Sequence, residues 1–139
     1  PSTPKGDRAV ISDREADALR RTALEYEVDG LNRPISGKGL EIKTVRPEWP
    51  VLVRQSYNPR NPVVVIRFGP DGKVKKAEFL RERDGSKGSG YEPVDGPILD
   101  AVYRWTARGA SIDNLDKSDP EAEVVVSIRI ILVSRRPVP

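Results

Sequence analysis

The sequence predicts an α+β fold: a ββαβ unit with a three-stranded antiparallel sheet and one packing helix, preceded by an N-terminal helix and an extended segment. A β-branched run at Val63–Phe68 is followed by a turn signal and a second strand pattern. Apolar residues then recur at helical spacing from Ile98 to Trp105, and strict alternation marks the end of the chain. The length of 139 residues suits one domain with an ordinary core.

The N-terminal part is expected to extend the fold rather than form its centre. Residues 1–11 are polar, contain Pro and Gly, and indicate a tail or the end of a linker. Ser12 offers a cap for a helix that runs to about Glu27, with a glutamate three positions later as its capping-box partner. A short strand is predicted within residues 40–45, so the extension covers residues 12–45.

Four prolines between residues 47 and 62 indicate an extended segment, because proline donates no ladder hydrogen bond and biases its predecessor toward extended geometry. Residues 51–53 are predicted to form an edge strand between two of these prolines. An Asp-Gly dipeptide at positions 71 and 72 is a strong turn signal, so Val63–Phe68 and residues 74–81 are predicted to form a hairpin. A break in the alternation predicts a bend near Lys75.

A helix and a long strand are predicted to complete the fold. Asp95 is the expected cap of the helix, Gly109 its expected stop, and Trp105 lies on its apolar stripe and is expected in the core. The final strand, about residues 121–133, has one strictly apolar face and a second face that is also fairly apolar. We expect this strand at the edge of the sheet, where its unpaired N–H and C=O groups would accept a partner strand. The N-terminal segment or a second copy of the chain could equally cover this edge, and internal pairing of the edge would exclude strand addition.

Composition argues against most catalytic classes. The chain has no Cys and no His, which removes disulfides, thiol nucleophiles, His-based triads and the usual zinc and haem ligands. We therefore predict no enzymatic activity, no metal and no cofactor. The net charge of +3 comes from 24 basic and 21 acidic residues spread along the chain, whereas nucleic-acid binding favours clustered basic residues. No nucleic-acid partner is predicted, and no apolar stretch approaches the ~18 residues of a membrane span.

Several smaller patterns have ordinary structural interpretations. The Gly/Ser loop at residues 85–90 departs from a Walker phosphate loop in the position of its Lys, so a simple connection is favoured. The acidic residues at positions 84, 92 and 95 lack EF-hand spacing. Glu78 and Glu82 would be the paired carboxylates if the chain were a small enzyme, but alternating charge on a strand more often marks a solvated face. Trp49, in its Pro-bounded segment, is the aromatic residue that we expect to contact a partner.

From Pro47 to Val133 the order of these signals resembles the C-terminal domain of TonB and its TolA-related relatives. That family shows Pro-x-Tyr-Pro, a strand, Asp-Gly-x-Val, a second strand, a Leu-Asp-led helix that ends in Trp, and a last strand. Over about 87 residues, the corresponding stretches here are Pro47-Glu48-Trp49-Pro50, Val63–Phe68, Asp71-Gly72-Lys73-Val74, the helix from Leu99-Asp100 to Trp105, and the final strand. A Trp replaces the usual Tyr, and residues 106–109 replace the usual Phe-x-Pro.

The resemblance implies that residues 46–136 form a periplasmic interaction module without an active site. Its partner would be an extended peptide of an outer-membrane transporter, added to the last strand, and its role would be energy transduction from an inner-membrane motor. Because the chain begins at Pro1 without Met, we expect a processed or excised form whose inner-membrane anchor was removed. The alternative is a self-associating cell-envelope scaffold domain, which would form a homodimer through the same strand.

The predicted partner-binding residues lie in the Pro-bounded segment and along the outward face of the last strand. They are Trp49, Pro50, Val125, Ser127, Arg129, Ile131, Val133 and Arg135. The arginines at 129, 135 and 136 flank the expected edge, where they would favour an acidic partner or simply keep the edge soluble.

Overall fold

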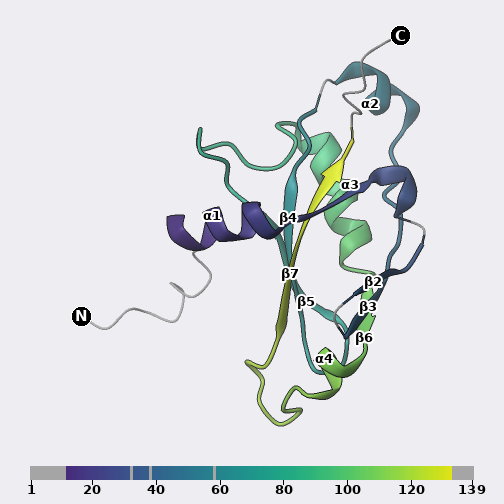
Figure 1. Ribbon diagram of the computed structural model, residues 1–139. Helices are drawn as coiled ribbons and strands as arrows, with labels where there is room; N and C mark the ends of the chain where they lie inside the picture. The colour runs from purple at the N-terminus through teal and green to yellow at the C-terminus, as the bar shows by residue number, and fades with distance from the viewer. Residues whose placement is uncertain (1–11, 32, 38, 58, 133–139) are drawn as a thin grey trace.

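The computed structural model describes residues 12–31, 33–37, 39–57 and 59–132. As the sequence predicts, the fold is α+β; these residues form four α-helices and two sheets (Figure 1). The larger sheet has four strands and the smaller one three, so the prediction of a single three-stranded sheet with one packing helix is wrong.

The strands of the larger sheet are, in spatial order, β1 (Leu24–Glu27), β7 (Val124–Ile131), β4 (Val63–Phe68) and β5 (Val74–Phe79). β1 runs parallel to β7, and the other neighbours are antiparallel. The smaller sheet contains β2 (Ile35–Gly37), β3 (Leu40–Lys43) and β6 (Thr106–Arg108). The helices are α1 (Asp13–Thr22), α2 (Val51–Ser56), α3 (Glu92–Val102) and α4 (Ala110–Asp113), with a 3-10 turn at Val28–Gly30.

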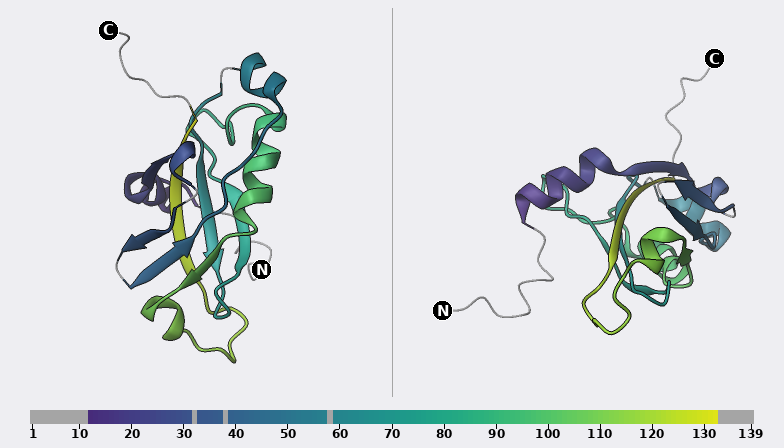
Figure 2. Two further views of the ribbon diagram at one scale, coloured as in Figure 1. Left: turned by 90° about the vertical axis from the view of Figure 1, so that its right-hand side faces the viewer. Right: turned by 60° about the horizontal axis from the view of Figure 1, so that its bottom comes forward.

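Helices cover both faces of the larger sheet, α3 on one side and α1 on the other (Figure 2). Successive side chains of β4 point to opposite faces of the sheet, so alternate residues pack toward α3 and toward α1. Val64, Ile66 and Phe68 pack on the α3 side, whereas Val63 and Val65 pack on the α1 side. A strand that is covered on both faces reads as a continuous apolar run, which is the pattern that predicted β4.

β7 lies inside the larger sheet, between β1 and β4, and is not the edge strand that the sequence predicts. Its neighbour β1 comes from residues 24–27, which local sequence patterns place at the end of the first predicted helix; that helix ends at Thr22 instead. Ser12 caps it as predicted, because its side chain accepts a hydrogen bond from the Glu15 N–H (3.2 Å). Pairing with β7 is a tertiary interaction, and it outweighs the local helix propensity of these residues.

The hairpin formed by β4 and β5 is confirmed, together with its bend. Phe68 pairs with Val74, but the preceding Arg67 pairs with Lys76. Lys75 therefore has no opposite residue in β4, which is a β-bulge at the predicted place.

Two other elements differ from prediction. Residues 51–53 are expected as an edge strand but form the start of α2. Pro50 is compatible with this helix because the residue that precedes a helix does not have to donate a backbone N–H to it. α3 begins at Glu92 rather than at Asp95, and the Asp95 carboxylate accepts a hydrogen bond from the Ser89 N–H (2.8 Å). α3 also ends at Val102, well before Gly109, because the next residues form β6 and pair with β3.

The turn of the hairpin joins the two sheets through Gly72. This residue has φ +78°, and its carbonyl accepts a 2.7 Å hydrogen bond from the Ala107 N–H in β6. A Cβ atom at position 72 would lie 2.3 Å from the Ala107 carbonyl oxygen. The space beside this glycine is therefore filled by the backbone of the second sheet.

We expect Gly72→Ala to lower the free energy of unfolding by roughly 2–3 kcal/mol, from backbone strain plus the clash with β6. Urea denaturation followed by circular dichroism measures this loss. Gly85→Ala is the matched control, because Gly85 also has a positive φ (+88°) but a Cβ atom at position 85 would have no atom of the described residues within 4 Å beyond its chain neighbours. Equal losses in the two variants would show that backbone strain, and not the contact between the sheets, accounts for the effect.

Candidate functional site

The edge of β7 that faces away from β4 is open over half its length. β1 pairs only with residues 128–131 of β7. No strand of the described chain pairs with residues 124–127 on that side, and Figure 1 shows this lower half of β7 without a neighbour beyond β4. The prediction of a free edge thus fails for one half of the strand, while the other half is open.

The backbone of Val125 faces this open side. The Ile130 N–H donates to the carbonyl of Pro62, on the β4 side of the strand (2.9 Å). Backbone groups of successive residues in a strand point to opposite sides, so the odd-numbered residues of β7 face away from β4. Val125 is also 42 % exposed. Its N–H and C=O groups are therefore placed to pair with an added strand.

The opposite edge of the sheet, β5, is blocked at its middle by a side chain. The Ala77 N–H donates a 3.0 Å hydrogen bond to the Tyr103 hydroxyl, and that hydroxyl donates in turn to the Ala77 carbonyl (3.3 Å). One hydroxyl thus occupies both backbone groups that Ala77 presents at this edge. A strand that added to β5 would have to displace Tyr103 first, so the two edges of the sheet are not equivalent.

We expect Tyr103→Phe to expose the edge of β5. The variant should lose about 1 kcal/mol of stability, because the Ala77 backbone groups lose their protein partner, and it should associate at lower concentration than the parent chain. Denaturation in urea and sedimentation velocity measure the two effects. Tyr57→Phe is the control, because no hydrogen bond joins the Tyr57 hydroxyl to the described residues. A Tyr103→Phe chain that stays monomeric up to the concentration that the control tolerates would argue against a blocking role.

A polar groove lies beside the covered half of β7, on the face of the sheet that α1 covers. Its volume is 810 Å³. Four arginines and three carboxylates dominate its lining. They are Arg20, Arg60, Arg83, Arg129, Glu25, Glu82 and Asp84.

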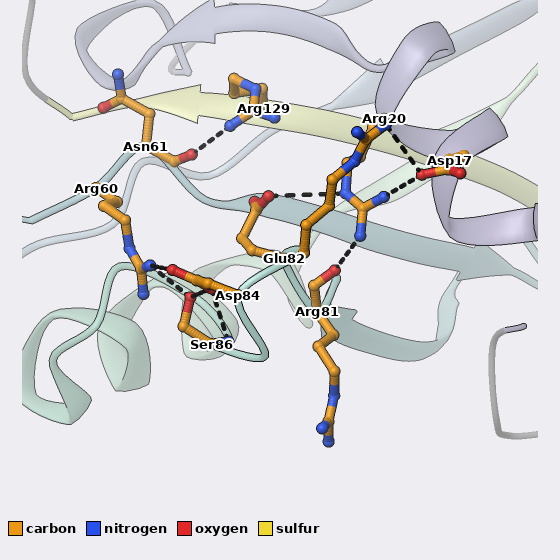
Figure 3. A network of polar contacts seen from close by, with 10 residues as sticks. Asp17, Arg20, Arg60, Asn61, Arg81, Glu82, Asp84, Ser86 and Arg129 are labelled. Atoms are coloured by element: carbon orange, nitrogen blue, oxygen red, sulfur yellow. Dashed lines mark hydrogen bonds and ion pairs between the residues drawn. The ribbon is translucent and has the colours of Figure 1, made fainter. Parts of the chain in front are cut away.

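Most arginines of the groove are neutralised within the chain (Figure 3). Arg20 binds Asp17 at 2.6 Å and lies 3.7 Å from Glu82. Arg60 binds Asp84 at 3.2 Å, and Arg83 lies 3.5 Å from Asp17. Hydrogen bonds from the Ser86 hydroxyl and backbone N–H hold the pKa of Asp84 below its ordinary value, and the charge of Arg60 acts in the same direction. Asp84 is therefore ionised at neutral pH and balances Arg60.

Arg129 differs from these arginines. It donates to the backbone carbonyl of Asn61 (2.7 Å), and it forms no ion pair with any residue that the structure describes. Its register partner in β1 is Glu25, which lines the same groove. Among the residues that the structure describes, no carboxylate forms an ion pair with the guanidinium of Arg129, unlike those of the other three groove arginines.

The predicted contact residues of β7 lie together on the α1 side of the sheet, and the predicted aromatic contact lies elsewhere. Arg129 and Ile131 line the groove, and Val125 lies on the open edge. Ser127 is buried and donates to the Leu19 carbonyl of α1 (3.0 Å), so it holds the helix on the sheet. Val133, Arg135 and Arg136 lie outside the described residues.

Trp49 is anchored to α3 rather than presented to solvent. Its Nε1–H donates to the Val94 carbonyl (2.9 Å), and its ring packs against the main core. Pro50 is exposed where α2 begins, at the far end of the molecule from the open half of β7 (Figures 1 and 2). The structure thus does not bring these two residues together with the open edge.

Other patterns singled out in the sequence have structural partners. Glu78 lies 3.8 Å from the Lys76 ammonium, and Glu82 faces Arg20. No three potential metal-ligating side chains cluster among the described residues, and no described helix is long and apolar enough to cross a membrane. Comparisons with protein-family models, with curated proteins and with solved structures give no match.

Proposed function

We propose that this chain is an interaction module that binds an extended peptide by strand addition to the open edge of β7. The observation that carries the proposal is the asymmetry of the sheet: no described strand pairs with the outer edge of residues 124–127, whereas Tyr103 occupies the edge of β5. An extended peptide satisfies unpaired backbone N–H and C=O groups without a preformed pocket. The exposed Val125 would supply apolar contact beside those hydrogen bonds.

The resemblance to the TonB C-terminal domain supports this proposal. The chain contains β4, β5, α3 and β7 in this order, which agrees with the sequence of elements that the resemblance implies, although β6 and α4 lie between α3 and β7. On this basis the partner would be a periplasmic segment of an outer-membrane transporter, and the chain would transmit energy from an inner-membrane motor to which it is tethered. The fourth strand, β1, is an addition to that arrangement.

Self-association through the same edge is the second candidate function. An open segment centred on an exposed Val125 would pair with the same segment of a second copy as readily as with a foreign strand. The two functions would use the same surface. Peptide binding and dimer formation can therefore be measured in the same sample and compared directly.

A backbone-amide NMR titration tests the proposal. The probe is an extended peptide based on the N-terminal recognition segment of an outer-membrane transporter. Saturable shifts that begin at residues 124–127 are the expected result. Absence of shifts, together with a concentration-dependent dimer in sedimentation equilibrium, would favour self-association; absence of both would overturn strand addition at this edge.

A further inference from the structure

We infer that β1 occupies the place of the partner on the covered half of β7, and that binding displaces it. The inference rests on the proposed function, because it describes how the same site is regulated. The chain would hold its own strand over residues 128–131 until an extended acidic segment replaces it. The partner would then pair with the whole outer edge of β7 rather than with half of it.

β1 is held more weakly than the other strands of its sheet. It has four residues, pairs with β7 alone among the described strands, and runs parallel to β7, which is the less stable orientation per residue. Leu24 is 47 % exposed, and Glu25 and Glu27 are exposed as well. Only Tyr26 of this strand packs against the core, and it does so half-buried. A strand with so few buried contacts belongs to the part of a fold that opens first.

The segments on either side of β1 are anchored independently. Before it, Ala16 of α1 is buried against the sheet, and the Leu19 carbonyl accepts the hydrogen bond from Ser127. After it, Leu31 is fully buried in the main core. β1 can therefore leave β7 while both flanking anchors stay in place, and the displaced strand would remain tethered beside the groove.

The register of β1 indicates the chemistry of the partner. Glu25 is aligned with Arg129, and both residues line the groove in which Arg20 and Arg60 already have carboxylate partners. When β1 leaves, it takes Glu25 with it, and Arg129 then faces a groove with one negative charge fewer. An incoming strand that places Asp or Glu beside Arg129 would restore that charge, so we expect an acidic partner.

Hydrogen exchange tests the detachment of β1 without any partner. The amides of Arg129 and Ile131 face β1, whereas the amide of Ile130 is bonded to the Pro62 carbonyl. If β1 opens locally, Arg129 and Ile131 should exchange roughly a hundredfold faster than Ile130. Equal rates would mean that β1 leaves only when the whole domain unfolds, and would overturn the inference.

A reversible covalent lock tests the competition. Glu27 and Ile131 are register partners, and neighbouring strands lie about 4.8 Å apart, within the span of a disulfide. Because the chain has no native cysteine, Glu27→Cys with Ile131→Cys gives a single thiol pair. The probe is a synthetic peptide with the sequence of residues 21–30, which contains β1 itself. We expect oxidation to weaken binding of this probe by about tenfold or more, and reduction of the same sample to restore it.

The exchange rates and the binding results together show which part of the proposal fails. Equal binding by the oxidised and reduced forms, with slow exchange at Arg129 and Ile131, would overturn the displacement of β1 and leave strand addition at residues 124–127 intact. Fast exchange without probe binding in either form would overturn the capture of a partner strand at residues 128–131, whereas the titration with the transporter-based peptide decides the proposed function separately. A probe that carries Lys in place of Glu25 should bind several-fold more weakly than the original; equal affinity would overturn the assignment of an acidic partner.

Discussion

Trp105→Ala is expected to lower the free energy of unfolding by roughly 3–5 kcal/mol. The indole is 1 % exposed and packs in the main core beneath α3. Its Nε1–H also donates to the Val45 carbonyl (2.9 Å), next to the smaller sheet. The variant would lose both the apolar contact and the partner of a carbonyl group. Because domains of this size are stable by only about 5–15 kcal/mol, this single change should remove a large part of the total.

Urea denaturation followed by far-ultraviolet circular dichroism measures the loss, and two variants separate its causes. Trp105→Phe retains most of the buried apolar surface but removes the hydrogen bond to Val45, so it should cost clearly less than the alanine variant. Trp49→Phe removes the same kind of hydrogen bond at a half-buried position and should cost least. Equal losses for all three variants would contradict the assignment of Trp105 to the core.

Local patterns predicted the elements whose partners are close in the chain. β4 and β5 form a hairpin, and its pairing depends on a turn and on two adjacent strands; even the bulge at Lys75 was visible as a break in alternation. Trp105 was predicted in the core from helical spacing, and it is buried although it lies just beyond the end of α3. For the hairpin the deciding interactions span one turn; the burial of Trp105 involves distant residues such as Val45, but the spacing of its chain neighbours was enough to predict it.

Elements that depend on distant partners were not predictable in this way. Residues 24–27 suit a helix locally, and only their pairing with β7, about a hundred residues later in the chain, makes them a strand. The fairly apolar second face of β7 indicated that this face is covered, as α1 covers it, but it gave no signal of a strand paired along the edge.

In the candidate site, too, the features set by local pattern were predictable and those set by contacts between distant segments were not. The odd-numbered residues of β7 were placed on one face by alternation, which located Val125 and Arg129. The arginines that line the groove with Arg129 come from α1, from the segment before β4 and from the loop after β5. The block at the other edge depends on Tyr103 reaching Ala77 in another element. No periodicity within one segment reports such contacts, because they arise only when the elements pack.

Val125→Pro is expected to abolish strand addition while leaving the sheet intact. The Val125 N–H faces the open edge and not β4, so a proline at this position removes a donor that none of the described strands uses. Its ring would also project into the path of the added strand. We expect the dissociation constant for the extended peptide to rise by about tenfold or more.

Val125→Thr is the matched control, because it keeps the backbone N–H and the β-branched shape and changes only one methyl group. Affinity within about threefold of the parent chain is the expected result for this variant. Amide spectra must show residues of β4 unperturbed in both variants, since their pairing with β7 uses the other side of the strand. If the proline variant binds the peptide as tightly as the threonine variant, the partner does not pair with the open edge of β7. Binding would then have to use the side chains of the sheet's α1-covered face, with Arg129 and its groove as the remaining candidate surface.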